Sequence, residues 1–337
     1  MNGRHLAGAA ILAAVLATGG ALLLARAALE PVAPGSVQTA IFTIAPGEPV
    51  GGVATRLKRD GLLKSALAFR LLARWRDLER DLQVGEFELS PAMTPGELLD
   101  RIVSGQVVTY EVVIPEGFTL AQIADRLAEA GVVDRDAFLA VARAPETAQA
   151  LRVEGDGLEG YLFPETYRIP RGLSARAVAR TLVQEFHRAW AEIAPLARER
   201  DFSMRETVTL ASIVEKETGA PQERPLIASV FWNRLNRSMR LETDPTVIYG
   251  IADFDGNLRR RHLEDRTNPY NTYVISGLPP GPIASPGRAA LRAVVEPAES
   301  DYLFFVSKND GTHVFSQTYR DHKRAVDRYQ RRGRRRQ

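Results

Sequence analysis

Apolar residues recur at helical spacing over residues 207–219, in the second half of the chain. Leu210, Ile213 and Val214 fall at positions i, i+3 and i+4, which lie on one face of a helix. Glu217 takes the next position of that face, i+7, where an apolar residue would continue the pattern. The sequence therefore predicts a helix whose apolar face ends in a carboxylate.

Both ends of this helix are marked. Ser203 and Glu206 predict a capping box, in which each side chain bonds a backbone amide of the first turn. Gly219 and then Pro221 follow the helix, as is typical beyond a helix C-terminus. These signals place Glu217 in the last turn.

The position of Glu217 favours general acid chemistry. A carboxyl that ends an apolar face is poorly hydrated, and it also lies at the negative end of the helix dipole. Both effects raise its pKa, and a raised pKa lets a carboxylic acid donate a proton near neutral pH. The alternative is that Glu217 is a solvated residue beside Lys216, without chemistry. Glu215 falls on roughly the opposite side of the helix.

The chain begins with a run free of charged residues, 6–24, about as long as a helix that crosses a bilayer. Arg4 before the run indicates an N-terminus inside the cell, although Arg26 behind it makes the charge bias small. Residues 25–27 resemble a signal-peptidase site, but the run is longer than the core of a signal peptide. We expect an uncleaved anchor over residues 1–28, with the rest of the chain exported.

An internal repeat follows a linker rich in Pro, Gly and Ser at residues 29–40. Its two copies are offset by 70 residues, from Gly47 to Gly117 and from Gly61 to Gly131. Each copy predicts a strand, a tight turn, an amphipathic helix and a glycine stop. This pattern, over residues 41–150, resembles a LysM-like module, which implies binding of N-acetylglucosamine polymers. The alternative is a structural spacer.

The composition of the chain limits which kinds of catalytic and binding site it can contain. The 337 residues, 45% of them hydrophobic, are enough for two or more domains with real cores. The absence of cysteine excludes disulfides, thiolate catalysis and zinc–thiolate sites. The five histidines are dispersed, so we expect neither a metal site nor a cofactor. A net charge of +3 gives no indication of nucleic-acid binding, and residues 331–337 are expected to be a basic, disordered tail.

Several loops carry residues suited to binding. Residues 158–167 place aromatic rings and prolines among two carboxylates, which suits a sugar site but equally a buried loop. Residues 268–273 and 277–283 contain prolines, which restrict the backbone, and are rich in Tyr, Asn and Gly. Binding residues concentrate on loops that a scaffold holds in place. A hairpin is also predicted, around Asn309-Asp310-Gly311.

Five motifs follow one another along the chain. They are Glu-Gly-Tyr-Leu-Phe-Pro-Glu-Thr-Tyr (159–167), Ala-Ser-Ile-Val-Glu-Lys-Glu-Thr (211–218), Thr-Asp-Pro-Thr-Val-Ile-Tyr-Gly (243–250), Tyr-Asn-Thr-Tyr (270–273) and Gly-Leu-Pro-Pro-Gly-Pro-Ile (277–283). With these motifs in this order, the chain closely resembles the YceG-like family, the endolytic murein transglycosylases, over nearly its full length. The resemblance implies an α+β fold, with an N-terminal transmembrane helix, LysM-like β-α subdomains and an α+β lytic transglycosylase domain over residues 151–330.

The resemblance also implies a function. Such a protein sits in the bacterial inner membrane and faces the periplasm. It cleaves the β-1,4 bond between N-acetylmuramic acid and N-acetylglucosamine within nascent glycan strands and leaves a 1,6-anhydro end. It works beside the glycan polymerases and terminates strand growth.

By the same resemblance, Glu217 is the catalytic acid. The residues expected to bind substrate are Glu165, Glu242, Thr243, Asp244, Tyr249, Tyr270, Asn271 and Tyr273. The family often has Gln at the position of Glu242. The extra carboxylate would either alter a hydrogen bond to the substrate or, if it lies close to Glu217, raise the pKa of Glu217 by like-charge repulsion. Glu215 is expected to matter little for activity.

Two other functions remain compatible with the sequence. A muramidase-type hydrolase would use Glu217 as the acid and Asp244 as the second carboxylate, as ordinary glycosidases do. A non-catalytic wall-binding scaffold would use the LysM-like region alone. The carboxylate on the apolar face argues against the scaffold, because a binding protein gains nothing from it.

Overall fold

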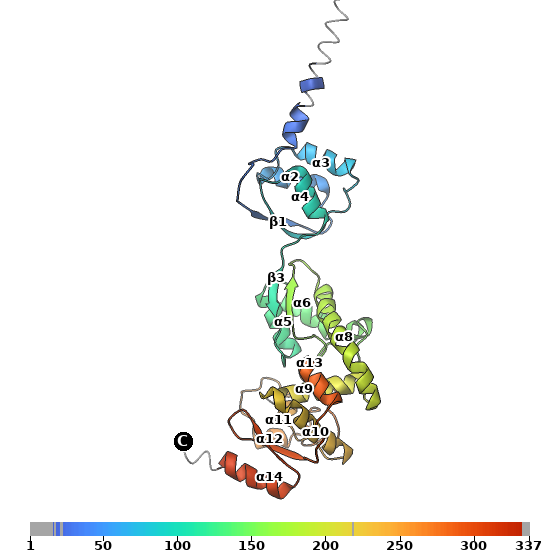
Figure 1. The fold of residues 1–337 in the computed structure, drawn as a ribbon, viewed down its shortest axis with the longest axis vertical. Coiled ribbons are helices and arrows are strands. Elements are labelled where there is room, and N and C mark those ends of the chain that lie inside the picture. The colour runs from blue at the N-terminus through green and yellow to red at the C-terminus, as the bar shows by residue number, and fades with distance from the viewer. Residues whose placement is uncertain (1–15, 17, 21–22, 218, 332–337) are drawn as a thin grey trace, which may run out of the picture. The chain divides into compact units, whose positions relative to one another are not determined.

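A computed structural model describes residues 16, 18–20, 23–217 and 219–331. These residues form helices and short two-stranded sheets, which divide into two compact units (Figure 1). The first unit runs to Tyr110 and also includes Ile169–Leu173, and the second holds Glu111–Arg168 and the chain from Ser174 onward. This division differs from the expected boundary after residue 150. The second copy of the repeat lies in the second unit, because its helix α6 (Arg135–Ala142) packs against α8 (Ala175–Glu199).

The first unit is built on an antiparallel pair of strands, β1 (Ala40–Ile44) and β2 (Gly85–Leu89), with Phe42 opposite Phe87. Among the described residues, the helices that build its core are α2 (Val50–Arg59), α3 (Ala66–Trp75) and α4 (Pro95–Val103). Both phenylalanines are buried, together with one side of each helix. Alternation along the strands thus sends every second side chain into one core.

The internal repeat is visible as the same order of elements. The second copy consists of β3 (Tyr110–Val113), α5 (Leu120–Glu129), α6 and, after the short α7 (Pro145–Ala150), β4 (Thr166–Ile169), and β3 pairs with β4. All of it except Tyr110 and Ile169 belongs to the second unit. Gly47 and Gly117 adopt φ of 76° and 75°, and Gly61 and Gly131 adopt 74° and 67°. Residues with a side chain rarely take this left-handed conformation, so the glycines set the turn and the stop in both copies.

The rest of the second unit surrounds the predicted central helix, α9 (Met204–Glu217). Its capping box is present, since the Ser203 amide donates to Glu206 Oε2 (2.9 Å) and the Glu206 amide donates to Ser203 Oγ (3.2 Å). Helices α8, α10, α11 and α13 all pack against it. The remaining elements are η1 (Pro221–Glu223), α10 (Arg224–Asn236), α11 (Asp244–Tyr249), α12 (Arg260–Leu263), α13 (Arg288–Val295), β5 (Phe304–Ser307), β6 (His313–Ser316), α14 (Tyr319–Val326) and η2 (Asp327–Arg331).

Parts of two predicted segments lie outside the described residues. They are most of the apolar run at 6–24 and residues 332–337 of the basic tail. Within the described chain, none of the helices combines the length and the apolar character that crossing a bilayer requires.

Candidate active site

Glu217, the last residue of α9, opens onto a pocket of about 360 Å³. The pocket collects side chains from six separate parts of the second unit. Those side chains belong to Glu217, Arg234, Leu241, Glu242, Asp244, Tyr273, Phe304, Phe305, Val306, Tyr319, His322 and Val326. The carboxyl is half-buried, so the alternative of a fully solvated last-turn residue does not describe it.

A threonine network holds the Glu217 carboxyl. Thr243, the N-cap residue of α11, donates its hydroxyl to Glu217 Oε1. The Thr243 amide in turn donates to Thr272 Oγ1 (3.0 Å), and the Thr246 hydroxyl donates to the Thr243 carbonyl (2.8 Å). All three threonines are buried. Because its partner is fixed from two sides, the carboxyl is oriented before any ligand arrives.

The surroundings of Glu217 favour its protonated form. The pKa of Glu217 is raised to about 7, mainly by burial and also by the negative charge of Asp244, while the hydrogen bond from Thr243 acts in the opposite direction. An acid with a pKa near 7 can give up its proton to a leaving group at neutral pH and recover one afterwards. The arrangement therefore suits a single group that acts first as an acid and then as a base.

Asp244 and Tyr273 form a polar edge of the same pocket. The Tyr273 hydroxyl donates to Asp244 Oδ1 at 2.7 Å. Burial raises the pKa of Tyr273, so the hydroxyl keeps its proton and stays a donor. Asp244 is exposed, which leaves its carboxylate accessible to a ligand.

Glu242 does not act on Glu217 as the sequence suggested. Its exposed side chain forms an ion pair with the buried Arg234. Arg234 also donates to the carbonyls of Arg240 (2.8 Å) and Leu303 (3.2 Å), so it ties this edge of the pocket to the C-terminal segment. Since Arg234 neutralises Glu242, the like charge that raises the pKa of Glu217 is that of Asp244.

Glu215 has a different place from the one expected. Its carboxylate is buried, pairs with Arg224 at 2.6 Å and accepts the Gly287 amide at 3.0 Å. Arg224 also reaches Glu116, at 3.3 Å. Glu215 therefore connects three segments of the second unit, and its role is to hold the fold around α9.

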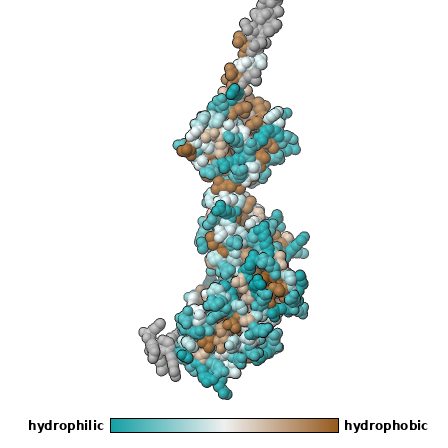
Figure 2. All heavy atoms as spheres, viewed as in Figure 1, coloured by the Kyte–Doolittle hydropathy of each residue, from teal (hydrophilic) through white to brown (hydrophobic). Residues whose placement is uncertain are grey.

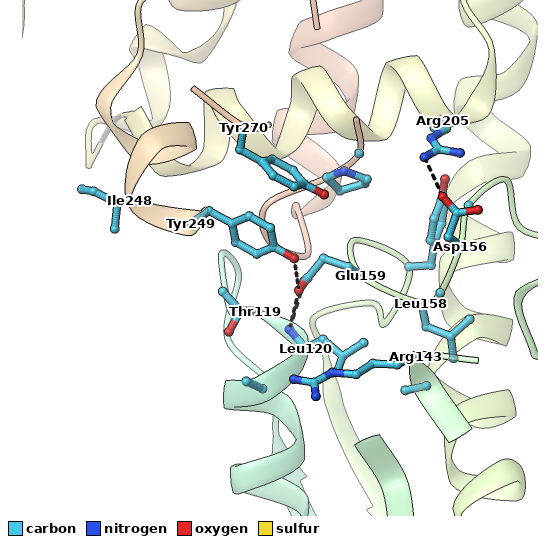
Figure 3. A pocket seen from close by; sticks show the side chains of 17 residues that line it. Thr119, Leu120, Arg143, Asp156, Leu158, Glu159, Arg205, Ile248, Tyr249 and Tyr270 are labelled. Atoms are coloured by element: carbon cyan, nitrogen blue, oxygen red, sulfur yellow. Dashed lines mark hydrogen bonds and ion pairs between the residues drawn. The ribbon is translucent and has the colours of Figure 1, made fainter. Parts of the chain in front are cut away.

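The other predicted binding residues do not gather around Glu217. Tyr249 and Tyr270 line a second pocket, of about 570 Å³ (Figure 3). Asn271 is fully buried, and its side-chain amide donates to three backbone carbonyls, the shortest contact being to Asp265 (2.7 Å), so it shapes its loop. Glu165 is exposed beside β4, accepts the Thr166 amide (2.8 Å) and lines neither pocket.

The sequence pattern missed two groups of residues. Phe304, Tyr319 and His322 come from the C-terminal hairpin and α14, and only long-range packing brings them to Glu217. Glu159 lines the second pocket, where it accepts the Leu120 amide and the Tyr249 hydroxyl. It is the first carboxylate of the aromatic motif, so the signal was present, but the sequence favoured Glu165. Among the described residues, no cluster of three or more His, Asp or Glu side chains can hold a metal ion.

Comparison with known proteins places the chain in a family. The profile of the YceG-like family matches residues 42–328. The chain belongs to the YceG-like family. Over 330 residues it is 30% identical to the endolytic murein transglycosylase of Bacillus subtilis, an alignment that covers 93% of this chain and 91% of that protein.

Two further proteins are similar. The endolytic murein transglycosylase of Streptococcus pneumoniae is 30% identical over 329 residues, which cover 88% of this chain and 60% of that longer protein. A crystal structure of a YceG-like protein from Listeria monocytogenes is 31% identical and matches with a TM-score of 0.60, covering 86% of this chain and 100% of that one. The mixed helix and sheet fold is thus the fold of this family.

Proposed function

We propose that this protein is an endolytic peptidoglycan lytic transglycosylase with Glu217 as its catalytic residue. The observation that carries the proposal is a half-buried carboxyl with a pKa of about 7, held by Thr243 at the wall of a pocket. Relatives that match most of this chain are named endolytic murein transglycosylases. The substrate is the glycan strand of peptidoglycan, cleaved between N-acetylmuramic acid and N-acetylglucosamine.

The reaction needs one carboxyl. Protonated Glu217 gives its proton to the glycosidic oxygen, the bond from that oxygen to the anomeric carbon breaks, and the acetamido group of the substrate stabilises the positive charge. Glu217, now ionised, takes the proton of the C6 hydroxyl of the sugar that carries this anomeric carbon. As the proton leaves, the C6 oxygen attacks the anomeric carbon. A 1,6-anhydro ring forms, and no water is consumed. An internal nucleophile has a high effective concentration, so no activated water is required.

The neighbouring groups fit these two steps. Thr243 donates to the Glu217 carboxylate and stabilises the ionised form after the first transfer. Asp244 and Tyr273, joined at 2.7 Å, and the Arg234–Glu242 pair offer hydrogen-bonding groups to sugar hydroxyls at the pocket wall. These residues would position the strand, while the chemistry stays with Glu217.

A hydrolase is the second candidate, because Asp244 lines the same pocket as Glu217. In that reaction water attacks the anomeric carbon and a reducing end results. Mass spectrometry of the products from purified glycan strands separates the two, since the anhydro product is lighter by one water. Reducing ends alone would overturn the transglycosylase proposal in favour of the muramidase. A protein that binds strands and leaves them intact would be the wall-binding scaffold.

The proposal includes a location and partners. Residues 6–24 would anchor the protein in the bacterial inner membrane, with the catalytic unit in the periplasm. The strand–helix–helix–strand repeat would contribute LysM-like binding of glycan. Glycan polymerases would be the partners, because strands are cut as they are made.

A further inference from the structure

The second pocket shares no lining residue with the pocket of Glu217. Its walls come from the start of α5, the end of α6, residues 155–161, the end of α11 with Tyr249, and the loop that carries Tyr270. Figure 3 shows Arg143 and Leu120 on one side of it and the ion pair of Arg205 with Asp156 on another. Its volume, about 570 Å³, lies in the range of pockets that hold small ligands.

The chemistry of this pocket matches a sugar. The rings of Tyr249 and Tyr270 meet edge to face, with centroids 4.8 Å apart, and present both apolar faces and hydroxyl groups. Glu159 is held by the Leu120 amide (2.9 Å) and the Tyr249 hydroxyl (3.0 Å), so the carboxyl and both rings are fixed relative to one another. Sugars carry apolar C–H faces and many hydroxyls, and such a site serves both.

Two arginines differ in how they are engaged. Arg205 is fixed by Asp156 (3.2 Å) and the Pro280 carbonyl (2.6 Å). Arg143 is exposed, and among the described residues its side chain forms no salt bridge and no hydrogen bond, although its positive charge favours the ionised form of Glu159. Its guanidinium is therefore free to bind hydroxyl, acetamido or carboxylate oxygens of a ligand.

One helix joins the two pockets. Asp244, at the start of α11, lines the pocket of Glu217, whereas Ile248 and Tyr249, at its end, line the second pocket. Five residues of helix rise by about 7.5 Å. The two pockets therefore lie at opposite ends of α11, which contributes to the wall of each. A polymer whose repeating units are sugars can occupy both at once.

We propose that the second pocket is a subsite for saccharide units of the same strand, remote from the bond that Glu217 cleaves. The inference rests on the proposed function and names the substrate unit that this pocket takes. Binding there is equal in the ground state and the transition state, so it lowers KM without changing kcat. Strands long enough to reach both pockets are therefore preferred over short ones.

The test compares glycan strands of two defined lengths on the full chain. Arg143→Gln and Tyr270→Phe should each raise KM for the long strands by about tenfold, the effect of losing one hydrogen bond to a charged or buried group. Neither should change kcat, and neither should affect strands too short to span the pockets. Arg237→Gln, an exposed arginine outside both pockets, is the matched control. Equal effects on long and short strands, or none on either, would overturn the inference.

A binding measurement keeps this test separate from the proposed function. Calorimetry with Glu217→Gln protein, which cannot turn over, should show weaker binding of long strands when Arg143→Gln is added. If wild-type protein forms no anhydro ends yet this difference appears, the catalytic proposal fails and the subsite stands. If anhydro ends form and the difference is missing, only the subsite fails.

A different observation, in the first unit, carries a second inference. Helix α3 buries Phe69 and Ala73 on one side. On its other side Leu67, Leu71 and Trp75 are 62%, 57% and 83% exposed. Their spacing of four residues aligns them in one stripe along the helix. Figure 2 shows apolar atoms gathered over the helical part of this unit, where α3 lies in Figure 1.

The charges beside the stripe indicate what covers it. Arg70 and Arg74 are exposed, lie between the three apolar residues and form no ion pair within the described chain. Helix α3 contains no acidic residue. A helix side that carries leucines, a terminal tryptophan and unpaired arginines is suited to lie on anionic lipid, with its rings and methyl groups at the headgroup level. We infer that this stripe rests on the surface of an anionic bilayer.

Quenching of Trp75 fluorescence by brominated lipid tests this contact. The Trp75 signal is the difference between the full chain and Trp75→Phe in vesicles. It should be quenched in phosphatidylglycerol and much less in phosphatidylcholine. Removing both arginines, by Arg70→Gln with Arg74→Gln, should weaken binding to the vesicles by about 30-fold, since each basic residue near an anionic surface increases the affinity about fivefold.

The matched control removes two exposed basic residues elsewhere on the unit, by Lys58→Gln with Arg80→Gln, and should leave the quenching unchanged. The inference fails if phosphatidylglycerol does not quench Trp75, or if both pairs of substitutions have the same effect. It also fails if soluble glycan strands shield Trp75 while lipid does not, because the stripe would then bind sugar.

Discussion

Glu217 shows how one residue can gather the requirements of a reaction. Its carboxyl combines burial, a charged neighbour in Asp244 and a donor in Thr243, and these together set its pKa to about 7. Replacement of Glu217 by Gln keeps the shape and removes the transferable proton. We expect a loss of roughly 10²–10⁴-fold or more, the range for general acid catalysis, because in the proposed mechanism this group also serves as the base. The rate of anhydro-end formation measures the loss, and circular dichroism should show an intact fold. A folded Glu217→Gln protein that retains its rate would refute the assignment.

The pH dependence follows from the same contacts. Glu217 must be protonated for the first step, so kcat/KM should fall as the pH rises above about 7. Asp244 raises the pKa of Glu217, and its replacement by Asn should move this fall to lower pH. Thr243 lowers the pKa, and Thr243→Val should move the fall to higher pH. Two shifts in the same direction would contradict this electrostatic account. A collapse of Asp244→Asn at every pH would favour the muramidase instead.

At the scale of elements, the sequence predicted what local signals determine. The capping box of Ser203 and Glu206, the glycine turns of the repeat and the C-terminal hairpin are each set by residues a few positions apart. The pocket around Glu217 depends instead on α14 and β5, which lie about a hundred residues further along the chain. The hydrophobic periodicity of a sequence does not show which distant segments pack together. The separation of Tyr249 from Tyr273 into two pockets was hidden for the same reason.

Glu215 illustrates the limit of reasoning from one helix. Helical spacing alone predicted that Glu215 matters little for activity, but its side chain is buried against Arg224 and Gly287. Breaking a buried pair by removing one partner typically costs about 3 kcal/mol or more. We therefore expect Glu215→Gln to lower the free energy of unfolding by about 3 kcal/mol, while the folded fraction keeps its activity. Denaturant unfolding measures the first quantity, and the rate per folded molecule measures the second. Unchanged stability would show that the ion pair contributes little.

At the scale of the whole molecule, the open prediction is its topology. The apolar run at residues 6–24 predicts one membrane pass with the N-terminus inside. A reporter fused after Gln337 should then be active only outside the cytoplasm. A second fusion, placed before the run, is the control and should be active only inside. Cytoplasmic activity of the C-terminal fusion would contradict the topology.

The path of the chain has a consequence for how such a protein can evolve. Because the first unit takes in Ile169–Leu173, the chain passes between the two units three times. A gene crossover at residue 110 would exchange most of the first unit but leave that segment inherited from the other parent. A chimera joined at that residue would therefore have a first unit of mixed parentage.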